Sequence, residues 1–258
     1  MLLSMEMTSW KQHARRSMLP NDVVICAIAL DEDLYIDEWI RYHLALGFSH
    51  IYIYDNGNTL KNRQSDKVTI IPFPGETKQL EAYTIFAFQY RTKHKWCAFI
   101  DIDEFIVVKN IHQFLTMYHD CAAIALNWKM FGTSNHTQYS EEPVTKRFRY
   151  YSNNDHFKSI IQLKYIISFS NPHLAKLQGL TYDTNRRVVV DSSNPNGDTK
   201  IACIHHYYTK SEEEFEKKIN RGRADIIQKR SMDELIDIHS KYNDIYNSDA
   251  WEFYSKLL

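Results

Sequence analysis

The chain has 258 residues, of which 44% are hydrophobic, enough for the core of one large domain or of two small ones. Its 31 basic and 32 acidic residues leave a formal net charge of −1, so no overall field favours nucleic acid, and any anion must bind to a local cluster of charges. The Gly-rich patterns of dinucleotide cradles and P-loops do not occur. The four cysteines lack C-x-x-C spacing and indicate a protein of a reducing, cytoplasmic compartment.

Residues 1–20 place their basic side chains after a weakly apolar start, an order that does not resemble a secretory signal. We interpret this segment as a solvated arm ahead of a single domain over 21–258. The alternative is contact of Trp10, Lys11, Arg15 and Arg16 with a membrane surface, which would make the protein membrane-peripheral. No stretch reaches the ~18 consecutive apolar residues of a membrane span.

In the first half, apolar runs alternate with segments of helical spacing. The predicted elements are, in chain order, strand 23–30, helix 35–46, strand 50–54, strand 67–73, helix 78–91 and strand 96–103. Gly47 is the predicted stop of the first helix. The alternation predicts an α/β fold with a mostly parallel central sheet flanked by helices. Ligands of such sheets bind beyond the carboxyl ends of the strands, where Asp31, Asp55 and Asp101 lie.

The second half is less regular. The predicted elements are strands over 122–129, 159–169 and 200–208, a loop over 131–142, and a helical tail from about Met232. Ser211 followed by Glu214 is a capping box, which predicts a helix that runs to about Asn220. No repeat or low-complexity linker divides the chain, so we expect one domain.

The stretch FIDIDEF, 99–105, places Asp101, Asp103 and Glu104 directly after an apolar run. If the strand ends at Asp101 and the chain turns, Asp101 and Asp103 can both approach one divalent cation. Oxygen ligands favour Mg²⁺ or Mn²⁺. The alternative is a solvated strand end with Glu104 in a surface ion pair.

The stretch IACIHHYYTKS, 201–211, adds His205, His206 and Lys210 just after an apolar run. Neighbouring side chains of a strand face opposite sides, so at most one of these histidines points into a given cleft. That histidine would be a third ligand beside the aspartates and would leave room for a diphosphate. A hydrogen-bonded core or surface histidine is the alternative.

Five stretches, which together cover most of the chain, follow one another in the order of a known family's motifs. They are ICAIALDEDLYIDEWIRYHLALGFSHIYIYDNG (25–57), Q-x-x-A-Y (79–83), W-x-x-F-I-D-I-D-E-F (96–105), W-x-x-F-G (128–132) and HYYTKSEEEFEKKINRGRAD (206–225). The ordered set resembles glycosyltransferase family 92 (DUF23-like) and the related bacterial glycosyltransferases grouped with family 2. Two positions depart from it: only Glu32 matches the family's K-N-E, and Asn135 stands where glycine is frequent.

The resemblance implies a GT-A fold, a Mn²⁺ or Mg²⁺ cofactor, and transfer of a hexosyl unit from a nucleotide-sugar, with UDP favoured, to the hydroxyl of a glycan or lipid-linked acceptor with inversion. It assigns Asp101, Asp103 and His206 to the metal, with His205 in reserve. The residues that it places around the donor are Glu32, Asp55, Gln79, Tyr83, Asp101 and Lys210. We expect a role in the assembly of a surface polysaccharide or lipopolysaccharide.

Inversion needs a base within hydrogen-bond reach of the acceptor hydroxyl. We favour Asp155 and His173, ahead of His136 and Glu142, and the alternative for each is an exposed loop residue. Trp128 can stack on a sugar face or belong to the core.

Two other functions fit the same carboxylates. A metal-dependent phosphoesterase would use them to activate water, although it normally needs further ligands for a second metal. A non-catalytic module would bind a sugar or nucleotide without turnover. The intact D-x-D, together with His206 and Lys210, argues against the non-catalytic module.

Overall fold

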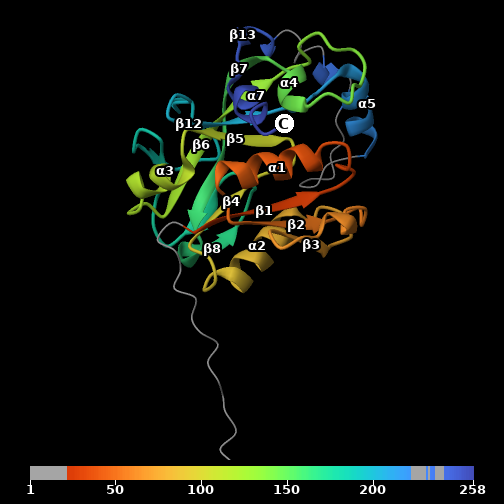
Figure 1. Ribbon diagram of the computed structural model, residues 1–258. Coiled ribbons are helices and arrows are strands. Elements are labelled where there is room, and N and C mark those ends of the chain that lie inside the picture. Colours follow the sequence, from red (N-terminus) through yellow and green to blue (C-terminus); the bar gives the residue numbers. More distant parts are fainter. Residues whose placement is uncertain (1–21, 222–230, 232, 236–240) are drawn as a thin grey trace, which may run out of the picture.

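The computed structural model describes residues 22–221, 231, 233–235 and 241–258 (Figure 1). The predicted arm over 1–20, and residue 232, where the predicted helical tail begins, lie outside these residues. In the described part of the chain, one large sheet is formed by β1 (Val23–Ala29), β2 (His50–Asp55), β3 (Val68–Pro72), β4 (Trp96–Phe99), β5 (Glu104–Val108), β6 (Ala123–Phe131), β7 (Tyr150–Gln162), β10 (Thr181–Asp183), β11 (Val188–Val189), β12 (Ala202–His206) and β13 (Ile245–Tyr246).

A second, two-stranded sheet and several helices complete the fold. The small sheet pairs β8 (Ile166–Phe169) with β9 (Ala175–Leu177). The helices are α1 (Ile36–Leu46), α2 (Gln79–Tyr90), α3 (Ile111–Met117), α4 (Val144–Arg147), α5 (Glu212–Arg221) and α7 (Asp249–Tyr254), with short 3₁₀ turns at Lys61–Arg63 and Leu163–Tyr165. The predicted α/β architecture is thereby confirmed.

Strand β1 lies at the centre of the parallel part of the sheet, between β2 and β4. Its residues alternate between two cores: Val23 and Ile25 pack on the side of Trp39 in α1, whereas Val24 and Cys26 pack on the side of α2. Figure 1 shows the two helices on opposite sides of these strands. The continuous apolar run of this segment therefore reflects a strand that is covered on both faces.

Helix α1 ends at the predicted stop. Gly47 has a φ of 112°, in the left-handed region that favours glycine. The N–H of Gly47 donates to the carbonyl of Leu44, and the N–H of Phe48 donates to that of His43. These bonds close the last helical turn and direct the chain into β2.

Strand β7 makes the sheet mixed rather than mostly parallel. It runs antiparallel between β4 and β6, and so joins the parallel first half to the second half. The predicted bounds 159–169 were wrong, because β7 begins at Tyr150 and the chain leaves it after Gln162 for the separate strand β8. Residues 152–156 of β7 are polar and largely solvent-accessible, so they carry no apolar pattern that could reveal a strand.

The strand predicted over 96–103 is also shorter. Strand β4 ends at Phe99, and the chain turns through Asp101 and Asp103 before it enters β5. The capping box is confirmed, because Glu214 accepts hydrogen bonds from the N–H and the hydroxyl of Ser211 (3.0 and 2.6 Å) and α5 begins there.

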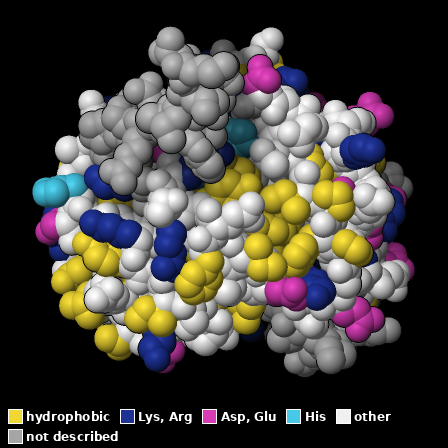
Figure 2. Space-filling model, turned by 90° about the horizontal axis from the view of Figure 1, so that it is seen from below, with side chains coloured by type: hydrophobic (Ala, Val, Ile, Leu, Met, Phe, Trp, Pro, Cys, Tyr) yellow, Lys and Arg dark blue, Asp and Glu magenta, His cyan; other side chains and the backbone are white. Residues whose placement is uncertain are grey.

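Viewed from below, apolar side chains gather over part of the surface (Figure 2). Helix α2 and β8 lie on this lower side in Figure 1, and they carry the exposed side chains Ile85, Phe88 and Ile167. The guanidinium of Arg91 lies 4.3 Å from the ring centroid of Phe88. Among the helices of the described ranges, none is long and apolar enough to cross a membrane.

Candidate functional site

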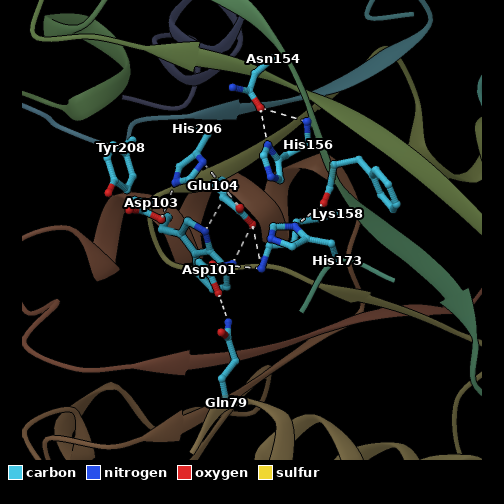
Figure 3. Close-up of polar contacts among 12 residues, drawn as sticks. Gln79, Asp101, Asp103, Glu104, Asn154, His156, Lys158, His173, His206 and Tyr208 are labelled. Carbon is cyan, nitrogen blue, oxygen red and sulfur yellow. Dashed lines mark hydrogen bonds and ion pairs between the residues drawn. The ribbon is translucent and has the colours of Figure 1, made fainter. Parts of the chain in front are cut away.

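A cavity of about 330 Å³ opens beyond the carboxyl ends of β1 and β4. Its walls come from both halves of the chain: the segments that follow β1 and β4, the first residue of α2, β6, β7, the turn between β8 and β9, the end of β12, and α5. Figure 3 shows polar side chains from several of these elements pointing toward one another. The cavity therefore lies where the parallel topology predicted a ligand site.

The turn after β4 brings both aspartates to the cavity. The N–H of Glu104 donates to the carbonyl of Asp101 (3.1 Å), and the N–H of Asp101 donates to the Glu104 carboxylate (2.9 Å). Strand β4 has already ended at Phe99, and from the turn that follows it Asp101 and Asp103 both line the cavity.

The two carboxylate oxygens of Asp101 have different partners (Figure 3). Oδ1 accepts from Gln79 Nε2 at 2.5 Å and from the Tyr83 hydroxyl at 3.3 Å, and Oδ2 accepts from Lys158 Nζ at 3.0 Å. Gln79 and Tyr83 lie one helical turn apart on α2, and both are buried. Burial, together with the charge of Asp101, holds the pKa of Tyr83 well above its ordinary value, so its hydroxyl remains a donor.

Asp103 is buried between a lysine and a histidine. Its Oδ2 accepts from Lys218 Nζ at 2.6 Å, and its Oδ1 lies 3.5 Å from His206 Nε2. Burial by itself would raise the pKa of Asp103, but Lys218 and His206 hold it well below its usual range. Asp103 is therefore ionised in the folded protein at neutral pH.

His206 lies between Asp103 and Glu104. Its Nδ1 is 3.9 Å from Glu104 Oε1, and its ring centroid is 4.3 Å from that of Trp128. Burial lowers the pKa of His206, although Asp103 opposes this effect, and the neutral ring is the form that binds metals. Burial and the neighbouring aspartates raise the pKa of Glu104, against the effect of Lys158.

The histidine before it faces the opposite side of β12. The ring centroid of His205 lies 4.7 Å from that of Phe131, and its Nδ1 is 3.5 Å from the Tyr207 hydroxyl. Only His206 of the two lines the cavity. The strand geometry thus selects His206 as the candidate ligand.

Three other residues predicted around the donor differ in position. Glu32 lines the cavity and accepts from Arg221 at 2.5 Å. Asp55 lies outside the lining, where its carboxylate accepts a backbone N–H of the loop that follows β2 (2.8 Å). Lys210 also lies outside the lining, with its Nζ 4.1 Å from the ring centroid of Tyr35. The last two therefore have structural partners instead of a place in the cavity.

Of the favoured bases, only His173 lines the cavity. Its Nδ1 donates to the carbonyl of Phe157 (2.9 Å), which leaves Nε2 as the acceptor. Burial and the nearby charge of Lys158 lower the pKa of His173 to about 4. The ring is therefore neutral at physiological pH.

Asp155 has a different position from the one predicted. It is exposed on β7, and its neighbours Asn154 and His156 are the ones that line the cavity, because successive side chains of a strand point to opposite faces. His136 and Glu142 also lie outside the lining, in the loop that precedes α4. The prediction that Asp155 lies in an acceptor loop at the site was wrong, because this residue belongs to β7 and its side chain points away from the cavity.

Trp128 forms an aromatic wall of the cavity. It stacks on His156 with 5.4 Å between the ring centroids and 24° between the planes, and it meets His173 edge-on at 5.2 Å. Trp128 is 8% exposed. It is consequently both a core residue and a cavity wall, so the two interpretations of its sequence position are compatible.

The donor set fits a divalent cation only in part. Among the described residues, no three His, Cys, Asp or Glu side chains form a group arranged to hold a metal ion. Asp103 and His206 converge on the cavity, and a carboxylate oxygen with a neutral imidazole suits Mn²⁺ or Mg²⁺ in kind. Both aspartates, however, are also bonded to a lysine: Asp101 Oδ2 to Lys158 (3.0 Å) and Asp103 Oδ2 to Lys218 (2.6 Å).

Sequence reasoning missed several side chains of the cavity, among them His156 on β7, and Lys218 and Arg221 on α5. The two cations belong to F-x-x-K-x-x-R-G, whose spacing of three residues places both on one face of a helix. That spacing is a signal that could have revealed them. His156 stands in no such pattern.

Comparison with known proteins now gives the class. The family model "Glycosyltransferase family 92" matches residues 21–243, which is most of the chain. The chain therefore belongs to glycosyltransferase family 92, as the ordered motifs predicted.

The similar curated proteins are plant members of this family. A family 92 protein of Oryza sativa subsp. japonica is 28% identical over 106 residues, which span 38% of this chain and 18% of that protein. One of Ricinus communis is 29% identical over 92 residues, which span 33% of this chain and 16% of that protein. The match thus covers less than a fifth of the length of either relative.

Two solved structures are distantly similar. The bifunctional IspDF of Campylobacter jejuni gives a TM-score of 0.40 at 14% identity, over 65% of this chain and 52% of that one. The S. aureus TarS 1-349 chain in complex with UDP gives a TM-score of 0.36 at 13% identity, over 55% of this chain and 47% of that one.

Proposed function

We propose that this chain is a metal-dependent glycosyltransferase with a GT-A-type fold. In this proposal it moves a hexosyl unit from a nucleotide-sugar, with UDP as the favoured nucleotide, to a hydroxyl of a glycan or lipid-linked acceptor, with inversion. Membership of family 92 supports the reaction class. The observation that carries the proposal is the cavity itself, where buried carboxylates and buried cations converge, because a diphosphate and a divalent cation need both kinds of charge.

Asp103 and His206 would hold the cation, with Asp101 as a third ligand. A bound Mn²⁺ or Mg²⁺ supplies charge stabilisation for the leaving nucleoside diphosphate. Gln79 orients Asp101 from the side of α2, and the neighbouring Glu104 supports the turn through the N–H of Asp101.

For the base we propose His173. Its Nδ1 is engaged by a backbone carbonyl, so the unprotonated Nε2 is the atom available to an acceptor hydroxyl. Trp128, 5.2 Å away between ring centroids, offers an apolar face for the sugar. Because Asp155 points to the other side of β7, we do not assign it this role.

We also propose that the enzyme is cytoplasmic, that it touches a membrane peripherally, and that it acts in surface polysaccharide or lipopolysaccharide assembly. The membrane contact is supported by the exposed Ile85, Phe88 and Ile167 of α2 and β8, with Arg91 against the ring of Phe88. Co-sedimentation with vesicles of anionic lipid, compared between the wild type and Phe88→Ser, tests it, and equal sedimentation of the two proteins would refute this surface.

Thermal unfolding with UDP, GDP or CMP, each with and without Mn²⁺, tests the main proposal. A hundredfold excess of ligand over its dissociation constant stabilises a protein by about 2.7 kcal/mol. We expect this stabilisation with UDP and Mn²⁺ together, and we expect Asp103→Asn to abolish it. Asp155→Asn, which lies outside the cavity, is the matched control and keeps it.

Release of UDP from UDP-hexoses with an acceptor present separates an enzyme from a binding module. Stabilisation without turnover of any UDP-hexose would favour the binding module. Cleavage of simple phosphodiesters would instead indicate a phosphoesterase.

A further inference from the structure

The cavity contains three carboxylate–cation pairs, in each of which an acidic residue from the first half of the chain meets a basic residue from the second half. The pairs are Asp101 with Lys158 at 3.0 Å, Asp103 with Lys218 at 2.6 Å, and Glu32 with Arg221 at 2.5 Å. All six side chains line the cavity. The charges of the cavity are therefore balanced within the protein, pair by pair.

These pairs are not ordinary surface ion pairs. Lys158 is 1% exposed and Lys218 is 7% exposed, and Asp103 is buried beside the latter. A buried charge that loses its partner is strongly unfavourable, and salt screens it little. Neither member of a buried pair can therefore be drawn away by a ligand unless the other member receives a new partner.

The two cations of α5 are presented together. Lys218 and Arg221 lie three residues apart, on one face of the helix, and both reach the cavity. The first turn of α5 is anchored by Glu214, which receives two hydrogen bonds from the buried Arg147 (2.7 and 2.9 Å). Cations on an anchored helix face suit the two phosphate groups of a diphosphate.

We propose that Lys218 and Arg221 bind the donor diphosphate, and that Lys218 does so by exchanging Asp103, a proposed metal ligand, for a phosphate oxygen. In the free protein Asp103 holds Lys218. When Asp103 turns to a divalent cation, Lys218 keeps the carbonyl of Tyr208 (2.7 Å) and gains a phosphate oxygen in place of Asp103. Arg221 keeps Glu32 and the carbonyls of Leu30 and Asp31, and it contacts a phosphate through its remaining N–H groups. This inference rests on the proposed function and gives the diphosphate contact to α5, not to Lys210.

The exchange makes metal and diphosphate binding interdependent. A diphosphate alone would draw Lys218 from Asp103 and leave this carboxylate with the neutral His206 as its neighbour (3.5 Å). A metal alone would leave Lys218 with the Tyr208 carbonyl but with no anion. Only the two ligands together give both Asp103 and Lys218 a partner of opposite charge, so each should raise the affinity for the other. Coupling of this kind typically changes affinity by about 5- to 150-fold, equally in both directions.

The test is a calorimetric titration of the whole chain with Mn²⁺, with UDP, and with UDP in the presence of Mn²⁺. We expect Mn²⁺ to raise the affinity of the wild type for UDP about tenfold or more. Lys218→Met should change the affinity for Mn²⁺ alone and the affinity for UDP with Mn²⁺ in opposite directions, because it removes the lysine from Asp103 and also removes the phosphate contact. Mn²⁺ alone should bind more tightly to this variant, and UDP with Mn²⁺ should bind about tenfold more weakly.

Two further variants keep the test decisive. Lys217→Met changes the neighbouring exposed lysine, which pairs with Glu213 outside the cavity, and should leave both affinities unchanged. Arg221→Gln should weaken UDP binding in the presence of Mn²⁺ even if Lys218→Met fails to fold. Pyrophosphate in place of UDP should show the same coupling, because the proposed contact is to the diphosphate.

The outcomes separate this inference from the proposed function. Wild-type protein that binds UDP and Mn²⁺ independently of each other, or a Lys218→Met variant that loses both affinities alike, overturns the partner exchange and leaves the glycosyltransferase proposal standing. Wild-type protein that binds no UDP under any condition overturns both.

Discussion

In the turn after β4, neighbouring side chains meet different partners. Asp101 contacts α2 and β7, whereas Asp103 contacts β12 and α5. Glu104 lies behind them, with its Oε2 bonded to the Asp101 N–H and its Oε1 facing His206 at 3.9 Å. This arrangement explains why a short acidic segment can lie at the sheet end: Lys158, Lys218 and His206 surround the three carboxylates, with Lys158 shared by Asp101 and Glu104 and His206 shared by Asp103 and Glu104.

A second buried histidine, His43 on α1, must be neutral in the folded protein. Its Nδ1 donates to the carbonyl of Trp39 (2.9 Å), and its Nε2 accepts the N–H of Ile106 (3.2 Å). Burial lowers the pKa of His43 to about 3. Protonation would turn the accepting nitrogen into a donor that faces another donor.

We therefore predict that acid destabilises the protein through His43. In the unfolded chain His43 binds a proton near pH 6.5, whereas in the folded chain it does so only near pH 3. The stability that neutral His43 contributes is therefore complete above about pH 6.5 and is lost as the pH falls. His43→Gln should reduce the slope of the unfolding free energy between pH 6 and 4 by about 1.4 kcal/mol per pH unit. Denaturant titrations at several pH values measure it. The exposed His119→Gln is the control, and an unchanged slope in His43→Gln would contradict the prediction.

At the scale of elements, α5 depends on one buried carboxylate. Glu214 accepts both terminal nitrogens of Arg147, the Tyr35 hydroxyl, and the N–H and hydroxyl of Ser211. Burial would raise the pKa of Glu214, but Arg147 and Ser211 lower it to about 2. Glu214 therefore caps the first turn of α5 and also attaches this helix to Tyr35 at the start of α1 and to Arg147 of α4.

We predict that Glu214→Ala destabilises the protein by about 3 kcal/mol, because it leaves the Arg147 charge buried without a partner. Glu216→Ala, an exposed position on the same helix, should change the stability little. Guanidinium unfolding curves give both values. Since the folded pKa is depressed, the contribution of Glu214 should also disappear as the pH falls from about 4.5 toward 2. Equal stability of Glu214→Ala and Glu216→Ala would show that the ion pair of Glu214 with Arg147 does not anchor α5.

At the scale of the whole molecule, β7 joins the two halves of the sheet. It pairs with β4 on one side and with β6 on the other. Its residues Ile160 and Ile161 belong to different cores, on opposite faces of the sheet. If β7 separated from the sheet, apolar residues of both halves would be exposed to water.

We therefore predict that the described fold unfolds in one cooperative transition. Tryptophan fluorescence and far-UV circular dichroism should give coincident guanidinium curves. Ile161→Ala should shift both curves together by about 3 kcal/mol, because it leaves a cavity in the shared core. Separate midpoints for the two signals would mean that the halves fold as independent units.

Several elements could be predicted because their signals are local. The apolar run before Leu30, the stop at Gly47 and the capping box at Ser211 each depend on residues a few positions apart. The polar part of β7 could not be predicted, because its strand character comes from pairing with β6 and not from its own composition. Asp155 was therefore interpreted as a loop residue, although it alternates with two residues of the cavity wall.

By itself, the sequence determined the α/β class, membership of family 92, and the acidic turn at Asp101 and Asp103, since these follow from local patterns and the order of motifs. Only the tertiary structure decided which cation meets which carboxylate. Lys218 reaches Asp103 across 115 positions of the chain. Such a contact depends on how α5 packs against the end of the sheet, and no local spacing encodes it. The choice of His206 over His205 has the same origin, because the face of β12 that borders the cavity is set by its pairing with β5 and β6.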